Sequence, residues 1–131
     1  MKTIFAIILF ALAVLLSAHV SASAQHGYTI EKPVKFAAGK TSAVLKSRLK
    51  SRLETHTYIL RAEAGKTLYV QLESKNAQMT FLVTDPADEK IGEAASEYWD
   101  WEAELTETGE YRILVHAIRG GGNYALTVQI K

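Results

Sequence analysis

Cysteine is absent from the 131-residue sequence. Its absence excludes disulfide bonds, thiol catalysis and lipid attachment to a cysteine at a signal-cleavage site. A small secreted eukaryotic domain is usually cross-linked, so an exported chain without cysteine is more typical of a bacterium. A domain of about 100 residues can bury enough surface to fold without such cross-links.

A long apolar run occurs at the start of the chain, over residues 4–16. It follows Lys2 and precedes Ala22-Ser23-Ala24, a small-x-small pattern typical of signal-peptidase sites. The run is too short for a membrane anchor, which takes about 20 apolar residues. We therefore predict a signal peptide over residues 1–24. A single domain over residues 25–131 would then be periplasmic or secreted, with no membrane anchor after cleavage.

Net charge is also small, +1 at pH 7, which argues against nucleic-acid binding. The charges are nevertheless unevenly placed. Residues 25–75 carry ten lysines and arginines against four glutamates, whereas residues 76–110 carry one lysine against ten acids. One interpretation is that neighbouring strands exchange charges across solvated faces. The alternative is an acidic patch around residues 85–104 that attracts a cation or a basic protein.

Apolar and polar residues alternate with a period of two along most of the domain. In residues 66–74, 98–105 and 123–131 the apolar side chains fall on one face, which is typical of half-buried antiparallel strands. Residues 110–118 carry apolar side chains on both faces, which predicts a central strand covered on both sides. Residues 41–53 also fit helical spacing, but their place among strands favours a strand followed by a loop.

Turn-forming residues separate these segments. Gly39 and Gly65 stand at the tips of two turns, Asp85-Pro86 begins a third, and Gly109 precedes the next strand. Residues 34–131 thus hold about eight strands with turns every 8–12 residues or so. The sequence predicts an all-β fold, an antiparallel β-sandwich or jelly roll, and no repeat or linker divides it.

Catalytic and metal-binding motifs are missing. The histidines of the domain, His26, His56 and His116, lack the spacing of a zinc site, and we expect His56 and His116 on strand surfaces. There is no G-x-S-x-G elbow for a nucleophilic serine. Carboxylates at 85–89 could bind calcium, but the twelve-residue calcium loop is absent and a solvated turn is favoured. We predict a protein that is not an enzyme and needs no cofactor or metal.

Aromatic residues cluster beside the acidic segment. Trp99 and Trp101 alternate with Asp100 and Glu102, so we expect both indoles to face the core rather than to form a platform for a sugar. Tyr98 falls on the acidic face. It is the better candidate for an exposed aromatic that binds a partner.

The run Gly120-Gly121-Gly122 could in principle bind a phosphate. A phosphate loop needs a helix N-terminus after the glycines, whereas here the clearest strand follows. The run therefore predicts a hairpin between the last two strands, with glycine and Asn123 at positive φ. Because Arg119 stands just before the turn, we assign Arg119, Gly120, Gly121, Gly122 and Asn123, together with Tyr98, as candidate partner-binding residues.

Core and turn residues recur in a characteristic order along residues 34–131. They are "VKFAAGKTSA" at 34–43, "YILRAEAGKTLYVQL" at 58–72, Asp85-Pro86, the L-x-x-x-G-x-Y of Leu105, Gly109 and Tyr111, and the closing Arg119, Tyr124, Leu126, Val128 and Ile130. In this order the chain resembles the bacterial periplasmic inhibitors of goose-type lysozyme. More weakly, it is similar to the pre-peptidase C-terminal β-sandwich modules of secreted peptidases.

The resemblance implies a non-enzymatic β-sandwich that protects the cell wall by pushing loops into the lysozyme cleft. It assigns Arg119 to an arginine-bearing loop before the last strand, and a guanidinium suits the carboxylates of a glycosidase. The loop is shorter here, "RGGGN" at 119–123, and residues 51–54 read "SRLE" where the family has glycine-tyrosine-aspartate. The alternative is a glycan- or protein-binding envelope module without inhibitory activity, carried by Tyr98 and the acidic face.

Overall fold

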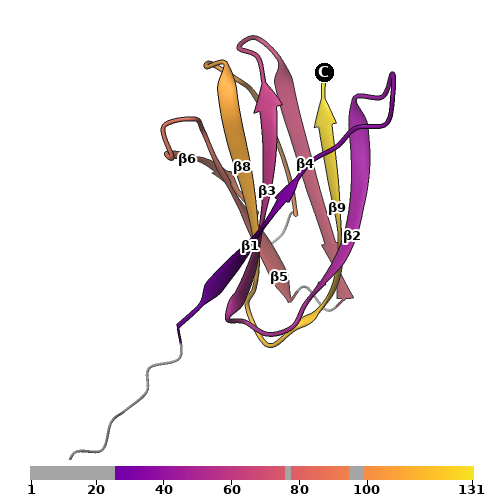
Figure 1. Ribbon diagram of the computed structural model, residues 1–131, viewed down its shortest axis with the longest axis vertical. Helices are drawn as coiled ribbons and strands as arrows, with labels where there is room; N and C mark the ends of the chain where they lie inside the picture. The colour runs from indigo at the N-terminus through magenta and orange to yellow at the C-terminus, as the bar shows by residue number, and fades with distance from the viewer. Residues whose placement is uncertain (1–25, 76–77, 95–98) are drawn as a thin grey trace, which may run out of the picture.

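The computed structural model describes residues 26–75, 78–94 and 99–131, which form a sandwich of two facing β-sheets (Figure 1). The strands are β1 (Tyr28–Pro33), β2 (Ser42–Leu49), β3 (Glu54–Ala62), β4 (Thr67–Ser74), β5 (Met79–Thr84), β6 (Lys90–Glu93), β7 (Asp100–Glu104), β8 (Gly109–Ala117) and β9 (Gly122–Ile130). The all-β sandwich predicted from the sequence is confirmed.

One sheet has five strands in the order β1-β3-β8-β5-β6, and the other has four in the order β2-β9-β4-β7. All pairs are antiparallel except β1 with β3, which run parallel. The eight strands expected from residue 34 onward are β2 to β9, and β1 adds a ninth before them. The parallel pair arises because β2, which separates β1 from β3 in sequence, lies in the other sheet.

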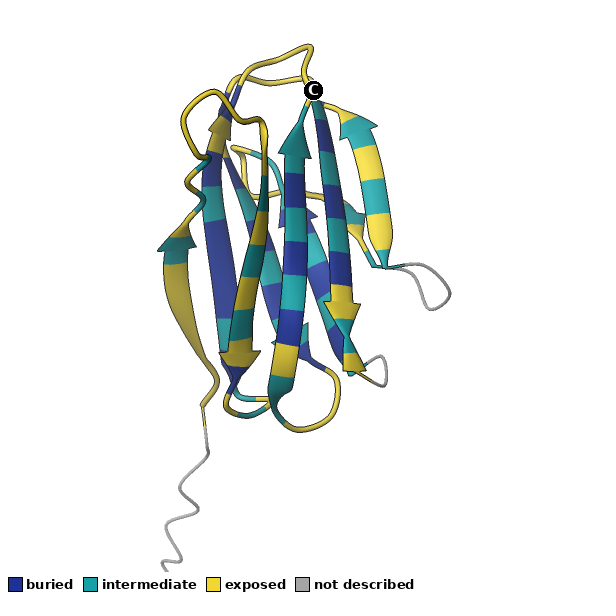
Figure 2. Cartoon of the chain, turned by 90° about the vertical axis from the view of Figure 1, so that its right-hand side faces the viewer, coloured by how far each residue is buried: buried dark blue, intermediate teal, exposed yellow. Residues whose placement is uncertain are grey.

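The core fills the space between the sheets, with buried side chains at every second position of the inner strands (Figure 2). Its members include Leu49, Tyr58, Leu60, Leu68, Val70, Phe81, Val83, Tyr111, Ile113, Val115, Leu126 and Val128. Burial of each large apolar side chain contributes about 1.5–3 kcal/mol to folding. The period-two segments predicted as half-buried strands are therefore confirmed.

Strands β2 and β8 test two of the sequence predictions. Residues 42–49 form β2, paired with β9 along its whole length, so the strand interpretation of this segment is confirmed. β8 is central in its sheet, as predicted, but the expected cover on both sides is wrong. Leu114 on its outer face is half-buried and Ile118, just past its end, is 55% exposed. Leu114 lies between Thr57 of β3 and Leu82 of β5 on this face.

The turn between β5 and β6 is closed by the side chain of Asp85. One of its carboxylate oxygens accepts hydrogen bonds from the amides of Ala87 and Glu89, both at 2.9 Å. Asp88 adopts a φ of 62° within this turn, while Gly39 and Gly65 have positive φ at the two tips expected for them. Asp85 therefore serves its own turn, and within the described residues no three histidine or acidic side chains converge as metal ligands.

Those acidic residues of segment 85–104 that the structure describes lie on both sheets. The turn that holds Asp88 belongs to the five-stranded sheet, whereas Glu102 lies on β7 of the four-stranded sheet. Arg112 lies 3.5 Å from Asp88, and Lys131 lies 3.6 Å from Glu102. These pairs support the exchange of charges within each sheet rather than one acidic patch, although Lys131 and Glu102 face each other across β4.

Trp101 forms a contact between β7, at one edge of the four-stranded sheet, and β6, at one edge of the five-stranded sheet. It lies on the edge strand β7, where it and Trp99 pack against the core, as the sequence predicted. Gly92 of β6 lies so close to the Trp101 indole that an added Cβ would clash with the ring. The contact requires glycine at position 92.

Two sequence predictions fall outside the described residues, the signal peptide over residues 1–24 and the exposed aromatic Tyr98. In the part of the chain that the structure describes, no helix has the length and apolar character needed to cross a membrane.

Replacement of Gly92 by alanine is expected to lower the free energy of unfolding by about 1–3 kcal/mol, because the methyl group would overlap the Trp101 indole. Urea denaturation measures the difference. In a Trp101→Leu background the same change is expected to cost less than about 1 kcal/mol, since the smaller side chain leaves space. An equal cost in both backgrounds would contradict the contact.

Candidate functional site

The loop that precedes the last strand crosses from one sheet to the other. β8 pairs with β3 and β5, whereas β9 pairs with β2 and β4, so the predicted hairpin between the last two strands is wrong. Residues 118–121, the crossover loop, carry the chain across one end of the sandwich (Figure 1). Alternation of side chains identified both strands, but it carries no information on which sheet each strand joins.

Each glycine of the crossover loop has a separate role. Gly120 has a φ of 53°, in the left-handed region that favours glycine. Gly121 lies against the backbone of Leu49 and Lys50, where an added Cβ would clash. Gly122 already begins β9, and Asn123 is an ordinary strand residue opposite Arg48. The positive φ expected for Asn123 is therefore wrong, because the strand starts one residue before it.

The crossover loop is held against its neighbours. The amide of Ile118 donates a hydrogen bond to the carbonyl oxygen of Gln78 at 2.7 Å. On its other side, the close approach of Gly121 places it beside the β2–β3 loop, residues 50–53. The two loops thus form one surface at this end of the sandwich.

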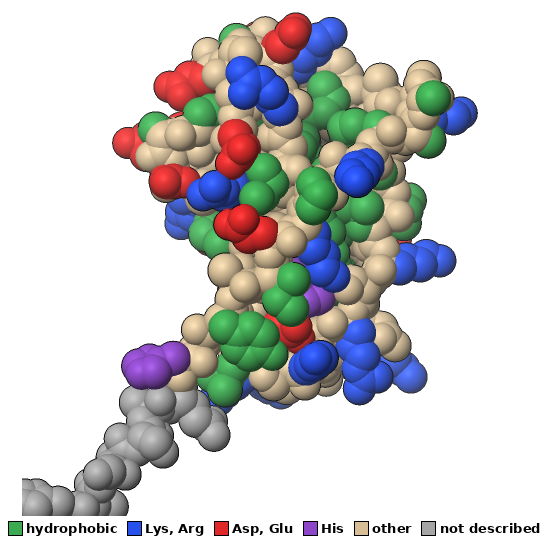
Figure 3. Space-filling model, in the orientation of Figure 1, with side chains coloured by type: hydrophobic (Ala, Val, Ile, Leu, Met, Phe, Trp, Pro, Cys, Tyr) green, Lys and Arg blue, Asp and Glu red, His purple; other side chains and the backbone are tan. Residues whose placement is uncertain are grey.

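This end of the molecule is strongly basic. Arg119 is exposed in the crossover loop, and Lys50 and Arg52 are exposed in the β2–β3 loop. None of the ion pairs found within the described residues involves these three cations. Figure 3 shows lysine and arginine side chains gathered at this lower end. Of these three cations, only Arg119 was predicted from the sequence as a partner-binding residue, although the "KSRLE" segment at 50–54 contains the other two.

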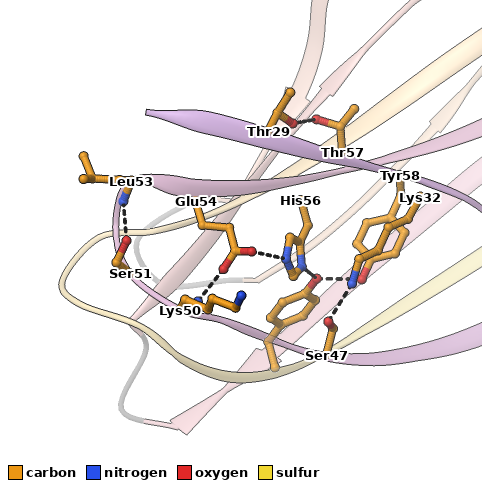
Figure 4. A network of polar contacts seen from close by, with 11 residues as sticks. Thr29, Lys32, Ser47, Lys50, Ser51, Leu53, Glu54, His56, Thr57 and Tyr58 are labelled. Carbon is orange, nitrogen blue, oxygen red and sulfur yellow. Dashed lines mark hydrogen bonds and ion pairs between the residues drawn. The ribbon is translucent and has the colours of Figure 1, made fainter. Parts of the chain in front are cut away.

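A chain of polar side chains lies in the core beneath these loops (Figure 4). Glu54, His56 and Tyr58 project from β3, and Tyr124 projects from β9 of the other sheet. His56 Nε2 lies 3.4 Å from Glu54 Oε1, and His56 Nδ1 lies 2.6 Å from the Tyr124 hydroxyl. The Tyr124 hydroxyl lies 2.6 Å from that of Tyr58. All four side chains are at most 4% exposed.

The expected place of His56 on a strand surface is therefore wrong, whereas His116 lies half-buried on the outward-facing side of β8. The period-two pattern of β3 indicates that His56 is buried, because His56 shares its face with Tyr58 and Leu60. A buried histidine is tolerated here because both ring nitrogens have partners.

The polar chain also fixes the loops above it. Glu54 Oε2 accepts a hydrogen bond of 2.5 Å from the amide of Lys50, so its carboxylate closes the β2–β3 loop. Tyr124 follows Asn123 directly and anchors the start of β9. Close to these polar side chains, Lys32 of β1 donates a hydrogen bond of 2.8 Å to Ser47 Oγ of β2. Side-chain hydrogen bonds thus link β1 to β2 and β3 to β9 between the two sheets below the basic end.

Electrostatics determine the protonation state of this chain. Burial lowers the pKa of His56, and the nearby Lys32 lowers it further. The hydrogen bond from the Lys50 amide lowers the pKa of Glu54, with a smaller contribution from His56. At neutral pH we therefore assign an ionised Glu54 and a neutral His56 that donates from Nε2 and accepts the Tyr124 proton at Nδ1. The groups are too deeply buried to meet a substrate, so their role is structural.

Protonation of His56 is expected to destabilise the fold at acid pH. Because its pKa is lower in the folded protein than the usual 6.5, stability is lost as the pH falls below about that value. Glu54 adds a further loss below about 4.5, since its pKa is also lowered by folding.

Urea unfolding of wild type and His56→Gln between about pH 7.5 and pH 5.5 tests this expectation. The variant should be less stable at neutral pH and should lose part of the pH dependence, the remainder coming from His116, whose pKa is also lowered by burial. The exposed His26→Gln should behave as wild type. A His56→Gln variant with the full wild-type pH dependence would disprove the assignment.

The two-sheet architecture also occurs in proteins of known structure. No family model and no curated protein sequence matches the chain. Among solved structures it is similar to PliG of Aeromonas hydrophila, a periplasmic inhibitor of g-type lysozyme, with 30% identity and a TM-score of 0.72 over 79% of this chain and 97% of that one.

Two further structures share the fold. PliG of Salmonella Typhimurium has 18% identity and a TM-score of 0.62 over 77% of this chain and 97% of that one. The pre-peptidase C-terminal domain of a Bacillus anthracis collagenase has 15% identity and a TM-score of 0.56 over 82% of this chain and 99% of that one. On the likeness to the Aeromonas protein, the chain belongs to the PliG family, whose solved members are periplasmic inhibitors of g-type lysozyme.

Proposed function

We propose that this protein is exported to a bacterial periplasm, where it binds and inhibits a goose-type lysozyme without catalytic activity of its own. The observation that carries the proposal is the 30% identity to the Aeromonas hydrophila inhibitor over 97% of that chain. The basic end of the sandwich supports it, because the cleft of a glycosidase carries acidic residues.

Arg119 is the residue proposed to enter the cleft. Its guanidinium is exposed at the end of the molecule and can form two parallel hydrogen bonds with one carboxylate. The packing of Gly121 and the hydrogen bond from Ile118 fix the backbone around it before any partner arrives. A preorganised loop loses less conformational entropy on binding, which favours affinity.

Neighbouring cations share this role in the proposal. The crossover loop is short, but Lys50 and Arg52 of the adjacent β2–β3 loop extend the same basic surface. Glu54, which holds that loop through the Lys50 amide, acts as a positioning residue. Tyr98, outside the described residues, remains a proposed contact on the strength of the sequence alone.

The Arg119→Ala substitution is expected to raise the inhibition constant for goose-type lysozyme by about 10- to 100-fold, as the loss of an interface arginine commonly does. Purified residues 25–131 are titrated into a cell-wall lysis assay with the enzyme. Arg61→Ala is the matched control, because Arg61 is an exposed arginine near the opposite end of β3. Its inhibition constant should equal that of wild type.

Two outcomes would contradict the proposal. Undiminished lysis at a large molar excess of wild type would exclude inhibition of that enzyme. Specific binding to peptidoglycan in a pull-down, with no effect on lysis, would favour the glycan-binding envelope module instead.

Export is expected to remove residues 1–24. Mass spectrometry of the protein recovered from the periplasm should give a mature chain that begins at Gln25, because Ala22 and Ala24 occupy the small-residue positions of the cleavage site. Ala22→Arg should leave an uncleaved precursor in the membrane fraction. A mature periplasmic protein that retains Met1 would refute the assignment.

A further inference from the structure

The outer face of the four-stranded sheet is hollowed beside the crossover loop. The hollow, named here the basic groove, has a volume of about 680 Å³ and lies over β2, β9 and β4. Its lining includes Lys46, Arg48, Glu73, Lys75, Asn123 and Ala125. The register explains its shape. Ala125 lies opposite Lys46 on one side and Glu73 on the other, so a short side chain forms the floor between long ones.

The groove carries an excess of positive charge. Lys46, Arg48 and Lys75 are exposed on its rim, against the single acid Glu73. No ion pair within the described ranges engages any of the three cations. Among the described residues, the other acids of this face lie on β7, where the register places them beside residues 67–71 of β4 and farther from the crossover loop. The positive potential of the groove is therefore not neutralised by its own sheet.

The groove is continuous with the basic end of the sandwich. Asn123 lines the groove and follows the crossover loop by two residues, and it lies opposite Arg48 in the β2–β9 register. Lys50, at the edge of the β2–β3 loop, is two residues beyond Arg48. The cations from Lys46 to Arg119 thus follow one surface around the corner of the molecule.

We propose that the basic groove is a second contact area for the lysozyme, one that takes an acidic segment of the enzyme surface beside its cleft. The inference rests on the proposed function. A stable protein–protein interface buries about 1,200–2,000 Å² in total, more than a loop of four residues supplies. The groove adjoins that loop and offers three cations without acidic partners among the described residues, so an acidic protein segment complements it in shape and charge.

Association kinetics with goose-type lysozyme test the groove. The variant Lys46→Gln/Arg48→Gln/Lys75→Gln removes its three cations. The control Lys35→Gln/Lys40→Gln/Lys66→Gln removes the same charge from exposed lysines at the other end. At low ionic strength the groove variant should bind at least about 10-fold more slowly, with a weaker salt dependence, and the control should change by less than about twofold.

A second variant tests the shape of the groove without changing its charge. Ala125→Gln fills the floor with a polar side chain on an outward-facing strand position, so thermal stability should be nearly unchanged. Its dissociation constant for the lysozyme should rise at least about fivefold, because the acidic segment can no longer enter. Thermal unfolding of each variant shows that it is folded.

The possible failures are distinguishable. If both groove variants bind lysozyme as the control does while Arg119→Ala binds weakly, the groove inference is wrong and the proposed function stands. The groove inference is also wrong if the groove variants lose binding to a soluble polyanionic glycan but keep full affinity for lysozyme. Absence of lysozyme binding by the wild type overturns both proposals.

Discussion

The hydrogen bond between His56 and Tyr124 joins the two sheets at the end of the sandwich that carries the candidate site. Through Glu54 it reaches the amide that closes the β2–β3 loop, and through Tyr124 it reaches the start of β9 beside the crossover loop. A polar chain in a core costs desolvation, and it is tolerated only when each member has a partner. The apolar core supplies most of the stability, while this chain fixes the loops relative to each other.

The connections between strands decide which residues meet. β8 and β9 are consecutive but lie in different sheets, so the glycines between them cross the end of the molecule instead of closing a hairpin. That crossing brings the loop that carries Arg119 against the loop that carries Lys50 and Arg52, which is distant in sequence. The result is a basic surface on rigid backbone, suited to an acidic partner and preorganised before binding.

Acidic and basic side chains lie in different parts of the molecule, although the net charge is close to zero. The net charge is +1, yet the acids of β7 pair with a neighbouring lysine or lie away from the crossover loop, whereas the cations of β2 and its loop have no acidic partners within the described residues. Membership of the PliG family and this separation of charges both support the proposed function. In the proposed complex, unpaired cations at the contact surface would favour an acidic cleft, even though they repel one another in the free protein.

Side-chain alternation and turn chemistry are local properties, so the all-β class, the inward faces of most strands and the turns at Gly39, Gly65 and Asp85-Pro86 could be predicted from the sequence. It also singled out Arg119. The sheets that β8 and β9 join, the burial of His56 and the groove bordered by Lys46, Arg48 and Lys75 became known from the three-dimensional fold. These features depend on pairing between strands far apart in the chain, and a local pattern carries no record of such pairing.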